Sequence, residues 1–391
     1  MTEAKHTFSR TEAGAVIIVS LVVALRLLGI FLLLPIFSVY ASRYPGANLP
    51  LAGVAFGSYA LTQSLLQIPM GWASDRWGRK PLLLLGLTLF TLGSLSCAVA
   101  KNIAQLIIAR AVQGSGAVAS VAIATLADMT HPNIRAQAFA VTGIAIGSAF
   151  MLGLLAGPLL AAQIGFSGLF YLLAALGALA TLTAGWFFPS VARSQAKKSV
   201  TSVKLILRNP ELRLIYLAGF VLSFTLNLFF FTYPLSWTDL GVERSQLWEV
   251  YLIIFIPSLL FVFPYVRYAE RRGRLWGVVR VGWLSILVGY TSYLFSALQK
   301  WGLYVSGAAF FLGYTMFQPL LPSFLTQRLP PEGRGTATGF YNFAGFLGAS
   351  LGGILAGTLS HIDHSLPEAV GLAVIVIWAL IGLPNTPDTT I

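Results

Sequence analysis

The stretch Gly71-Trp-Ala-Ser-Asp-Arg-Trp-Gly-Arg-Lys80 decides the fold, because it places one acidic and three basic side chains between two long apolar runs. Charged side chains are costly inside the hydrocarbon of a bilayer, so we expect this stretch in water at a membrane face. Half a chain later, Glu270-Arg271-Arg272-Gly273-Arg274 echoes the pattern of Asp75-Arg76-Trp77-Gly78-Arg79. The echo predicts two copies of one membrane unit, each with a charged hairpin after its second helix.

The composition indicates a membrane protein. Hydrophobic residues make up 57% of the chain and charged residues 10%, whereas soluble domains carry about 25% charged residues. Because a helix of about 20 apolar residues spans a bilayer, the sequence predicts an all-α membrane protein with twelve transmembrane helices. They cover roughly residues 14–40, 51–72, 81–100, 102–128, 137–164, 168–188, 212–237, 247–268, 276–297, 302–326, 336–359 and 367–384.

The basic residues are unevenly distributed between the two ends of these helices. Of the 25 lysines and arginines, 19 fall at the N-terminus or in connections that follow even-numbered helices. Cytoplasmic loops carry the excess of basic residues, so we expect both termini in the cytoplasm. The same bias explains the net charge of +12 without a nucleic-acid partner.

A second echo supports the duplication. Arg135 precedes the fifth predicted helix and Arg334 precedes the eleventh, each after a loop that contains proline. We therefore expect two pseudo-symmetric six-helix bundles with a substrate site between them near the middle of the membrane. The expected organisation is an N-terminal tail at 1–13, a first bundle at 14–188, a linker at 189–211, a second bundle at 212–384 and a C-terminal tail at 385–391.

Three patterns carry a family resemblance over nearly the whole chain. They are Gly71-x-x-x-Asp75-Arg76-x-Gly78-Arg79-Lys80, Arg110-x-x-Gln113-Gly114, and a looser helix-5 glycine pattern of Gly143, Gly147, Gly153, Gly157 and Pro158. With them the chain resembles the twelve-helix drug:proton antiporter branch of the major facilitator superfamily, and it is similar to YajR-type inner-membrane proteins. The resemblance implies the major facilitator fold in a bacterial inner membrane. Proteins of the YajR type carry an extra soluble C-terminal domain, for which we expect no counterpart before Ile391.

The charged hairpin is expected to act as a conformational latch. Gly71 and Gly78 permit close helix approach and a tight turn, and Arg76 and Lys80 suit anionic head groups. The resemblance implies a cluster of Asp75, Arg79 and Asp128 that closes against the start of the eleventh helix in the outward-facing state. The alternative is that these charges only fix the topology. The second-half echo consists of Glu270, Arg271, Gly273 and Arg274.

Two arginines, Arg26 and Arg110, lie inside predicted spans. An arginine within the membrane usually faces a cavity or a partner, so both are candidates for the substrate or proton pathway. Arg110 has an alternative, structural role, which is to bind backbone carbonyls of the first helix. None of the thirteen acidic residues lies at the middle of a span, where cation carriers need a carboxylate. The full candidate pathway is Arg26, Arg110, Gln113, Gln63, Gln67, Asn227, Tyr233, Gln318, Tyr341 and Asn342.

These features predict a secondary transporter that exports a small amphipathic molecule in exchange for protons by alternating access. An alternative is an exporter or facilitator of an organic anion, such as a carboxylate metabolite or siderophore, that uses Arg26 and Arg110. A further alternative is a non-transporting membrane sensor. An enzyme is not expected, because the four histidines and the single cysteine are scattered and no nucleotide-binding loop is present. We expect a monomer without cofactor or metal, whose partners are the small-molecule substrate, the proton and the lipid bilayer.

Overall fold

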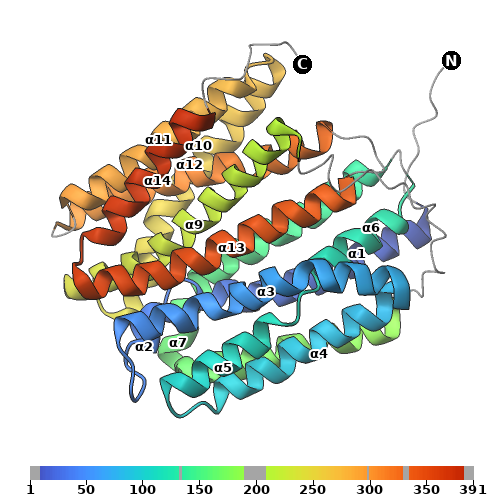
Figure 1. The fold of residues 1–391 in the computed structure, drawn as a ribbon, viewed down its shortest axis with the longest axis horizontal. Coiled ribbons are helices and arrows are strands. Elements are labelled where there is room, and N and C mark those ends of the chain that lie inside the picture. The colour runs from blue at the N-terminus through green and yellow to red at the C-terminus, as the bar shows by residue number, and fades with distance from the viewer. Residues whose placement is uncertain (1–8, 132–133, 189–207, 297–298, 329–333, 383–391) are drawn as a thin grey trace. The chain divides into compact units, whose positions relative to one another are not determined.

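The computed structural model describes residues 9–131, 134–188, 208–296, 299–328 and 334–382. Within these ranges every regular element is a helix, including one 3₁₀ turn, η1 (Arg244–Gln246). The α-helices, shown in Figure 1, are α1 (Arg10–Leu33), α2 (Phe37–Ala41), α3 (Leu49–Trp77), α4 (Arg79–Ala98), α5 (Ile103–Gly114), α6 (Ala119–Asp128), α7 (Arg135–Phe187), α9 (Pro210–Asp239), α10 (Leu247–Arg271), α11 (Leu275–Ser296), α12 (Lys300–Gln327), α13 (Arg334–Ile362) and α14 (Leu366–Gly382).

The helices are long and apolar enough for a membrane. Among the residues described, nine helices meet the length and hydropathy of a span, and α5 and α14 are shorter apolar helices. The 53 residues of α7 contain a non-helical residue, Gly165, with φ 76°, so this helix comprises two segments joined at a kink. The predicted all-α membrane fold is confirmed.

Two predicted spans are interrupted. The span expected at 14–40 consists of α1 and α2, because Pro35 removes a backbone donor and its ring clashes with the preceding turn. The span expected at 102–128 consists of α5 and α6, with a break at residues 115–118 that includes Gly116. A Cβ at Gly116 would overlap the carbonyl of Gly86 on α4. The glycine therefore permits close helix contact, which a hydropathy profile does not register.

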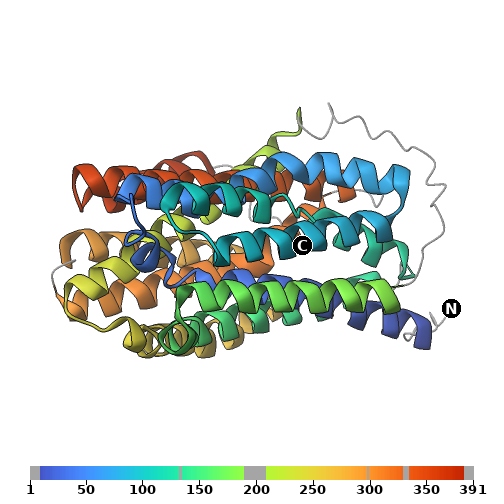
Figure 2. The same cartoon turned by 90° about the horizontal axis from the view of Figure 1, so that it is seen from below.

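The chain divides into two compact units. Unit 1 comprises Met1–Pro35 and Ser58–Ser199, and unit 2 comprises Ile36–Gly57 and Val200–Ile391. In unit 1, α1 packs along α7, and α4 packs against α5 and α7 (Figures 1 and 2). In unit 2, α9 packs along α13, and α11 packs against α12 and α14. Residues 1–8, 189–207 and 383–391 lie outside the described residues. They hold most of the expected linker, most of the expected N-terminal tail and all of the expected C-terminal tail, so the predicted domain boundaries stay a prediction.

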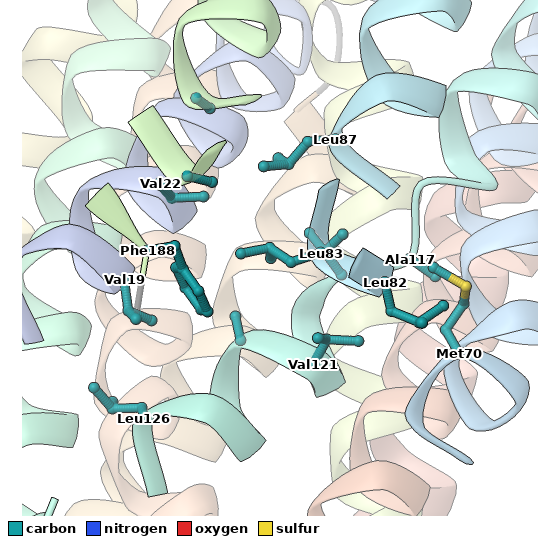
Figure 3. Close-up of a cluster of buried hydrophobic side chains, with 14 of the residues drawn as sticks. Val19, Val22, Met70, Leu82, Leu83, Leu87, Ala117, Val121, Leu126 and Phe188 are labelled. Carbon is teal, nitrogen blue, oxygen red and sulfur yellow. The ribbon is translucent and has the colours of Figure 1, made fainter. Parts of the chain in front are cut away.

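The two units have different cores. Aliphatic side chains from α1, α4 and α6, together with Phe188, gather around one apolar centre in unit 1 (Figure 3). Aromatic rings dominate unit 2. There Phe229 of α9 stacks on Phe310 of α12, with ring centroids 4.3 Å apart, and on Tyr233, with centroids 4.4 Å apart. Aromatic pairs of this kind add stability beyond the apolar area that they bury.

Candidate functional site

The hairpin between α3 and α4 brings together the charges of the expected latch. Gly78 turns the chain with φ 101°, a conformation that side chains disfavour. The turn places Arg79 so that its Nη1 lies 2.5 Å from Oδ1 of Asp75, and its Nε lies 3.0 Å from Oδ2 of Asp128. Arg79 Nη1 also donates to Ser74 Oγ at 2.6 Å. One guanidinium therefore binds α3 and the end of α6 to the start of α4.

The other hairpin residues hold the turn in place within unit 1. Lys80 Nζ donates to the carbonyl of Phe188 at 2.9 Å, which attaches the start of α4 to the end of α7. The guanidinium carbon of Arg76 lies 5.7 Å from the ring centroid of Trp72. The carbonyl of Gly71 accepts a hydrogen bond from a side chain one turn later. The latch function of these residues stays a prediction.

The echo hairpin between α10 and α11 also turns at a positive-φ glycine but lacks the charge cluster. Gly273 has φ 64°, and the amide of Arg274 donates to the carbonyl of Ala269 at 2.8 Å. The side chains of Glu270, Arg271 and Arg274 are exposed. None of them takes part in an ion pair among the described residues. The two hairpins thus share a positive-φ glycine but differ in their electrostatics.

Arg26 lies at the centre of a buried polar network in unit 1. Its side chain is 2% exposed, and its Nη2 donates to Tyr59 OH at 2.9 Å, Gln63 Oε1 at 2.7 Å and the carbonyl of Gly116 at 2.8 Å. The carbonyl belongs to the break between α5 and α6, where the C-terminal end of α5 is electronegative. The guanidinium carbon also lies 5.6 Å from the ring centroid of Phe90. Arg26 therefore supports an interrupted helix with a full positive charge.

A second arginine extends this network. Arg110 is 3% exposed and donates to Gln113 Oε1 at 2.5 Å. Gln113 Nε2 in turn donates to Ser94 Oγ at 2.8 Å. The guanidinium carbon of Arg110 lies 4.7 Å from the ring centroid of Tyr59, which also accepts from Arg26. Both predicted arginines therefore meet at one tyrosine, and Arg26 also donates to the backbone carbonyl of Gly116.

The two glutamines predicted on the second span, Gln63 and Gln67, are fully buried in α3. Gln63 Oε1 accepts from Arg26, while its Nε2 has no hydrogen-bond partner in the described part of the chain. A buried amide donor without a partner is unusual in a stable interior. This group is thus available to a ligand that reaches the network.

The predicted pathway residues of α9 make local contacts. Tyr233 is fully buried and its hydroxyl donates to the carbonyl of Leu303 at 2.8 Å. Asn227 is half-buried and its amide donates to the carbonyl of Ser223, one turn earlier, at 2.9 Å. Tyr233 therefore links α9 to α12, whereas the contact of Asn227 stays within its own helix.

The remaining predicted pathway residues lie on α12 and α13. Gln318 is exposed and its amide donates to the hydroxyl of Tyr314. Tyr341 is half-buried against Gly219 of α9, and Asn342 follows it on α13. All three residues belong to unit 2.

The helix-5 glycines of the family pattern divide into two groups. A Cβ at Gly153 or Gly157 would overlap the backbone of α1, so both permit close helix contact. A Cβ at Gly143 or Gly147 would meet no atom within 4 Å. Pro158 is buried within α7. The contacts therefore support a packing role for two of the four glycines.

Sequence reasoning missed one buried acid. Glu368, in the first turn of α14, is 2% exposed and faces the hydroxyls of Thr232 and Tyr293. Its position near a helix end suggested an ordinary surface acid. No local pattern signals this burial, because the Ser-x-x-Glu pattern from Ser365 is typical of a glutamate that caps the start of a helix.

Long apolar helices in two compact units, with charged side chains buried inside one of them, define a polytopic membrane protein with a polar interior. The chain belongs to the Major Facilitator Superfamily, whose family model matches residues 19–353 and 215–388. It is therefore a membrane transporter of this superfamily.

Among its relatives is the inner membrane transport protein YajR of Escherichia coli (strain K12), with 33% identity over 91% of this chain and 80% of that protein. The quinolone resistance protein NorA of Staphylococcus aureus (strain MRSA252) is 24% identical over 88% of this chain and 90% of that protein. The solved structure of a D-xylose-proton symporter superposes with a TM-score of 0.77 at 14% identity, covering 97% of this chain and 100% of that one. The predicted similarity to YajR-type proteins is confirmed, and these relatives are transporters rather than enzymes.

Proposed function

We propose that the protein is a proton-coupled exporter of a small amphipathic molecule that works by alternating access in a bacterial inner membrane. Membership in the superfamily and the relative named for quinolone resistance support this proposal. The expected partners are the substrate, the proton and the lipid bilayer, with both termini in the cytoplasm and a monomer as the working unit.

The observation that carries the proposal is the buried guanidinium of Arg26. All its hydrogen-bond acceptors are neutral, and no ion pair of the described residues includes it. Burial of a charge without a counter-charge is expensive, so such a group persists where function requires it. The break between α5 and α6 lies beside it, and interrupted helices are typical of transporter binding sites. A substrate group with negative or partial negative charge would complete this network.

The Asp75–Arg79–Asp128 cluster supports the alternating-access part of the proposal. Arg79 is only 15% exposed at its side chain, whereas Asp75 is 65% exposed. A charge-assisted contact between helices stabilises one arrangement of those helices over another. We infer that the cluster favours one of the two access states and releases when unit 1 rearranges.

A second candidate is the export of an organic anion, and the same arginine favours it. A permanently charged guanidinium binds a carboxylate through two parallel hydrogen bonds more strongly than it binds a neutral oxygen. Arg26 and Arg110 share Tyr59, so one carboxylate at this point would reach two positive groups. The charge of the transported molecule separates the two candidates.

Transport into inverted membrane vesicles tests both candidates. Vesicles from cells that lack their major efflux pumps are energised to an acid interior, and the protein is challenged with norfloxacin (zwitterionic), ethidium (cationic) and carboxyfluorescein (anionic). The proposal expects accumulation of norfloxacin that a protonophore abolishes. Accumulation of carboxyfluorescein alone would favour the export of an organic anion. Accumulation of ethidium alone would contradict the role given to Arg26.

The matched comparison is Arg26→Ala against Arg43→Ala. Arg43 is an exposed arginine in the connection between α2 and α3, so its removal changes the net charge equally without touching the network. Accumulation should fall to the level of empty vesicles in the first variant and stay near wild type in the second. Equal activity in both variants would refute the site.

A further inference from the structure

One carboxyl group of unit 2 is buried away from cations. Glu368 is the third residue of α14 and is 2% exposed. Helix α14 packs against α9, α11 and α13. None of the ion pairs in the described ranges includes Glu368. The group therefore lies inside its unit without the counter-charge that a buried carboxylate normally has.

The turn before α14 explains why this side chain points inward. Ser365 and Glu368 form the Ser-x-x-Glu pattern of a capping box, in which the glutamate would bind the serine amide. Here Asp363 takes that place, because its Oδ1 accepts from Ser365 N at 2.7 Å and from Ser365 Oγ at 2.6 Å. These hydrogen bonds lower the pKa of the exposed Asp363 carboxyl below its ordinary value. Glu368 is thus not needed as a cap.

The surroundings of the carboxyl group are hydroxyls and aromatic rings. Thr232 of α9 and Tyr293 of α11 face it, and Tyr290 lies nearby on α11. Tyr293 OH is also 2.9 Å from Oγ of the half-buried Ser236. Oε2 of Glu368 has no hydrogen-bond partner among the residues described. The titratable groups that face Glu368 are therefore two tyrosines from α11, while α9 contributes only hydroxyls.

The exposed turn adds two further ionisable residues, Asp363 and His364. Asp363 opposes a negative charge on Glu368, and His364 lies beside Asp363. A proton on Glu368 removes the cost of an uncompensated charge in this interior. The Tyr293 hydroxyl faces the carboxyl group and is hydrogen-bonded to Ser236 Oγ, so two linked hydroxyls extend from Glu368.

We propose that Glu368 is an exchangeable proton-binding site in unit 2 and that it carries the coupling proton, an assignment that rests on the proposed proton-coupled transport. The carboxyl group holds its proton while α14 is packed on α9 and α11, and releases it to water when that interface opens. Gly371, one turn later on α14, lies directly against the ring of Tyr290, which keeps this interface close. Thr232 and Tyr293 are positioning residues.

Infrared difference spectroscopy of the reconstituted full chain tests the proton site without a substrate. The protein in vesicles of Escherichia coli polar lipids is titrated from acid to alkaline pH, and the C=O stretching band of protonated carboxyl groups is followed. Glu368→Gln should lose a band that wild type shows at neutral pH and loses at alkaline pH. Glu249→Gln, which removes an exposed carboxyl group of α10, should keep it.

Identical spectra for wild type and Glu368→Gln would overturn the proposal. Glu368→Asp keeps a carboxyl group and should shift the band, which provides a second reading if the glutamine variant is unstable. For coupling, Glu368→Gln should retain norfloxacin counterflow without a pH gradient and lose proton-driven accumulation. If Glu368→Gln loses both counterflow and proton-driven accumulation, while wild type shows the band, the role of Glu368 is structural. Failure of wild type and every variant to transport norfloxacin would contradict the proposed function. The infrared spectra would still show whether Glu368 binds an exchangeable proton.

Discussion

The interiors of unit 1 and unit 2 carry opposite kinds of polar group. Unit 1 buries Arg26 and Arg110 in a network of amides and one tyrosine. Unit 2 buries an aromatic cluster around Phe229 and Phe310, with Glu368 at its edge. An arginine keeps its charge at every working pH, whereas a carboxyl group can gain or lose a proton. On the proposed function, unit 1 supplies the fixed charge for the substrate and unit 2 the variable charge for coupling.

The same difference shows that a sequence echo does not imply equal chemistry. Both units have a hairpin with a positive-φ glycine, Gly78 or Gly273. Among the described residues, only the first hairpin forms ion pairs, in which Arg79 binds the carboxylates of Asp75 and Asp128. The positive-φ glycine is thus repeated while the side-chain partners are not, so a role assigned to one unit has to be tested separately in the other.

Arg26→Ala is expected to have the largest effect on stability and transport, and it tests whether the buried arginine holds unit 1 together. Its removal leaves three buried acceptors without their donor, at about 1–3 kcal/mol each. The melting temperature of the purified protein should fall sharply and transport should be lost. Arg26→Lys keeps the charge but not the planar fork, so it should recover part of the stability. A melting temperature unchanged in Arg26→Ala would show that the network does not hold unit 1 together.

The aromatic core of unit 2 is tested by Phe229→Ala. Phe229 is fully buried and stacks on two rings, so its truncation should cost about 3 kcal/mol in the free energy of unfolding. The measurement is again thermal denaturation, with Phe263→Ala as the control, since that phenylalanine is 67% exposed. The Michaelis constant for substrate should not change. A large change in that constant would place the aromatic cluster in the binding site.

Close helix packing gives a smaller effect that sharpens the comparison. A Cβ at Gly57, in the part of α3 that belongs to unit 2, would lie 2.6 Å from the carbonyl oxygen of Ser350 on α13. Gly57→Ala should therefore destabilise the protein by about 1–3 kcal/mol. Gly143→Ala, where the space is open, should instead stabilise by about 0.5–1 kcal/mol. Equal melting temperatures for the two variants would contradict the packing.

The two hairpins give the smallest expected effect on stability. Asp75→Asn keeps the shape of the side chain and removes its charge, so transport should fall about tenfold, which corresponds to about 1.4 kcal/mol. The melting temperature should change little, because Asp75 is mostly exposed. Glu270→Gln, the matched change in the second hairpin, should leave transport within about twofold of wild type. An equal loss of transport in Asp75→Asn and Glu270→Gln would indicate that the hairpin charges only fix the orientation of the chain in the membrane.

Much of the fold followed from local properties of the sequence. The apolar runs predicted membrane helices because each span must satisfy its own backbone hydrogen bonds. The Asp75–Arg79 pair was predictable because the two residues lie four positions apart on the two sides of the expected tight turn at Gly78. The contact of Arg79 with Asp128 followed only from the family resemblance, since the two residues are far apart in the chain.

Other features could not be read from the sequence. Hydropathy treats residues 102–128 as one apolar run, so it did not reveal the break that Gly116 permits or the partner that Arg26 finds there. Glu368 reads as an acid at a helix end, because burial depends on α9 and α11, which pack on it from other parts of the chain. Long-range partners of polar groups are set by packing, not by spacing.

The sequence by itself determined that this protein crosses the membrane many times, that it belongs to a transporter family and that two arginines are buried in it. These properties depend on composition and short motifs, which act locally through the cost of placing polar groups in lipid. Only the tertiary structure decided which neutral groups surround Arg26, which hairpin forms ion pairs and that Glu368 is buried without a cation. Those outcomes depend on distances between helices that are remote in the chain, and a buried charge is stabilised or destabilised by the particular atoms that packing brings within hydrogen-bond reach.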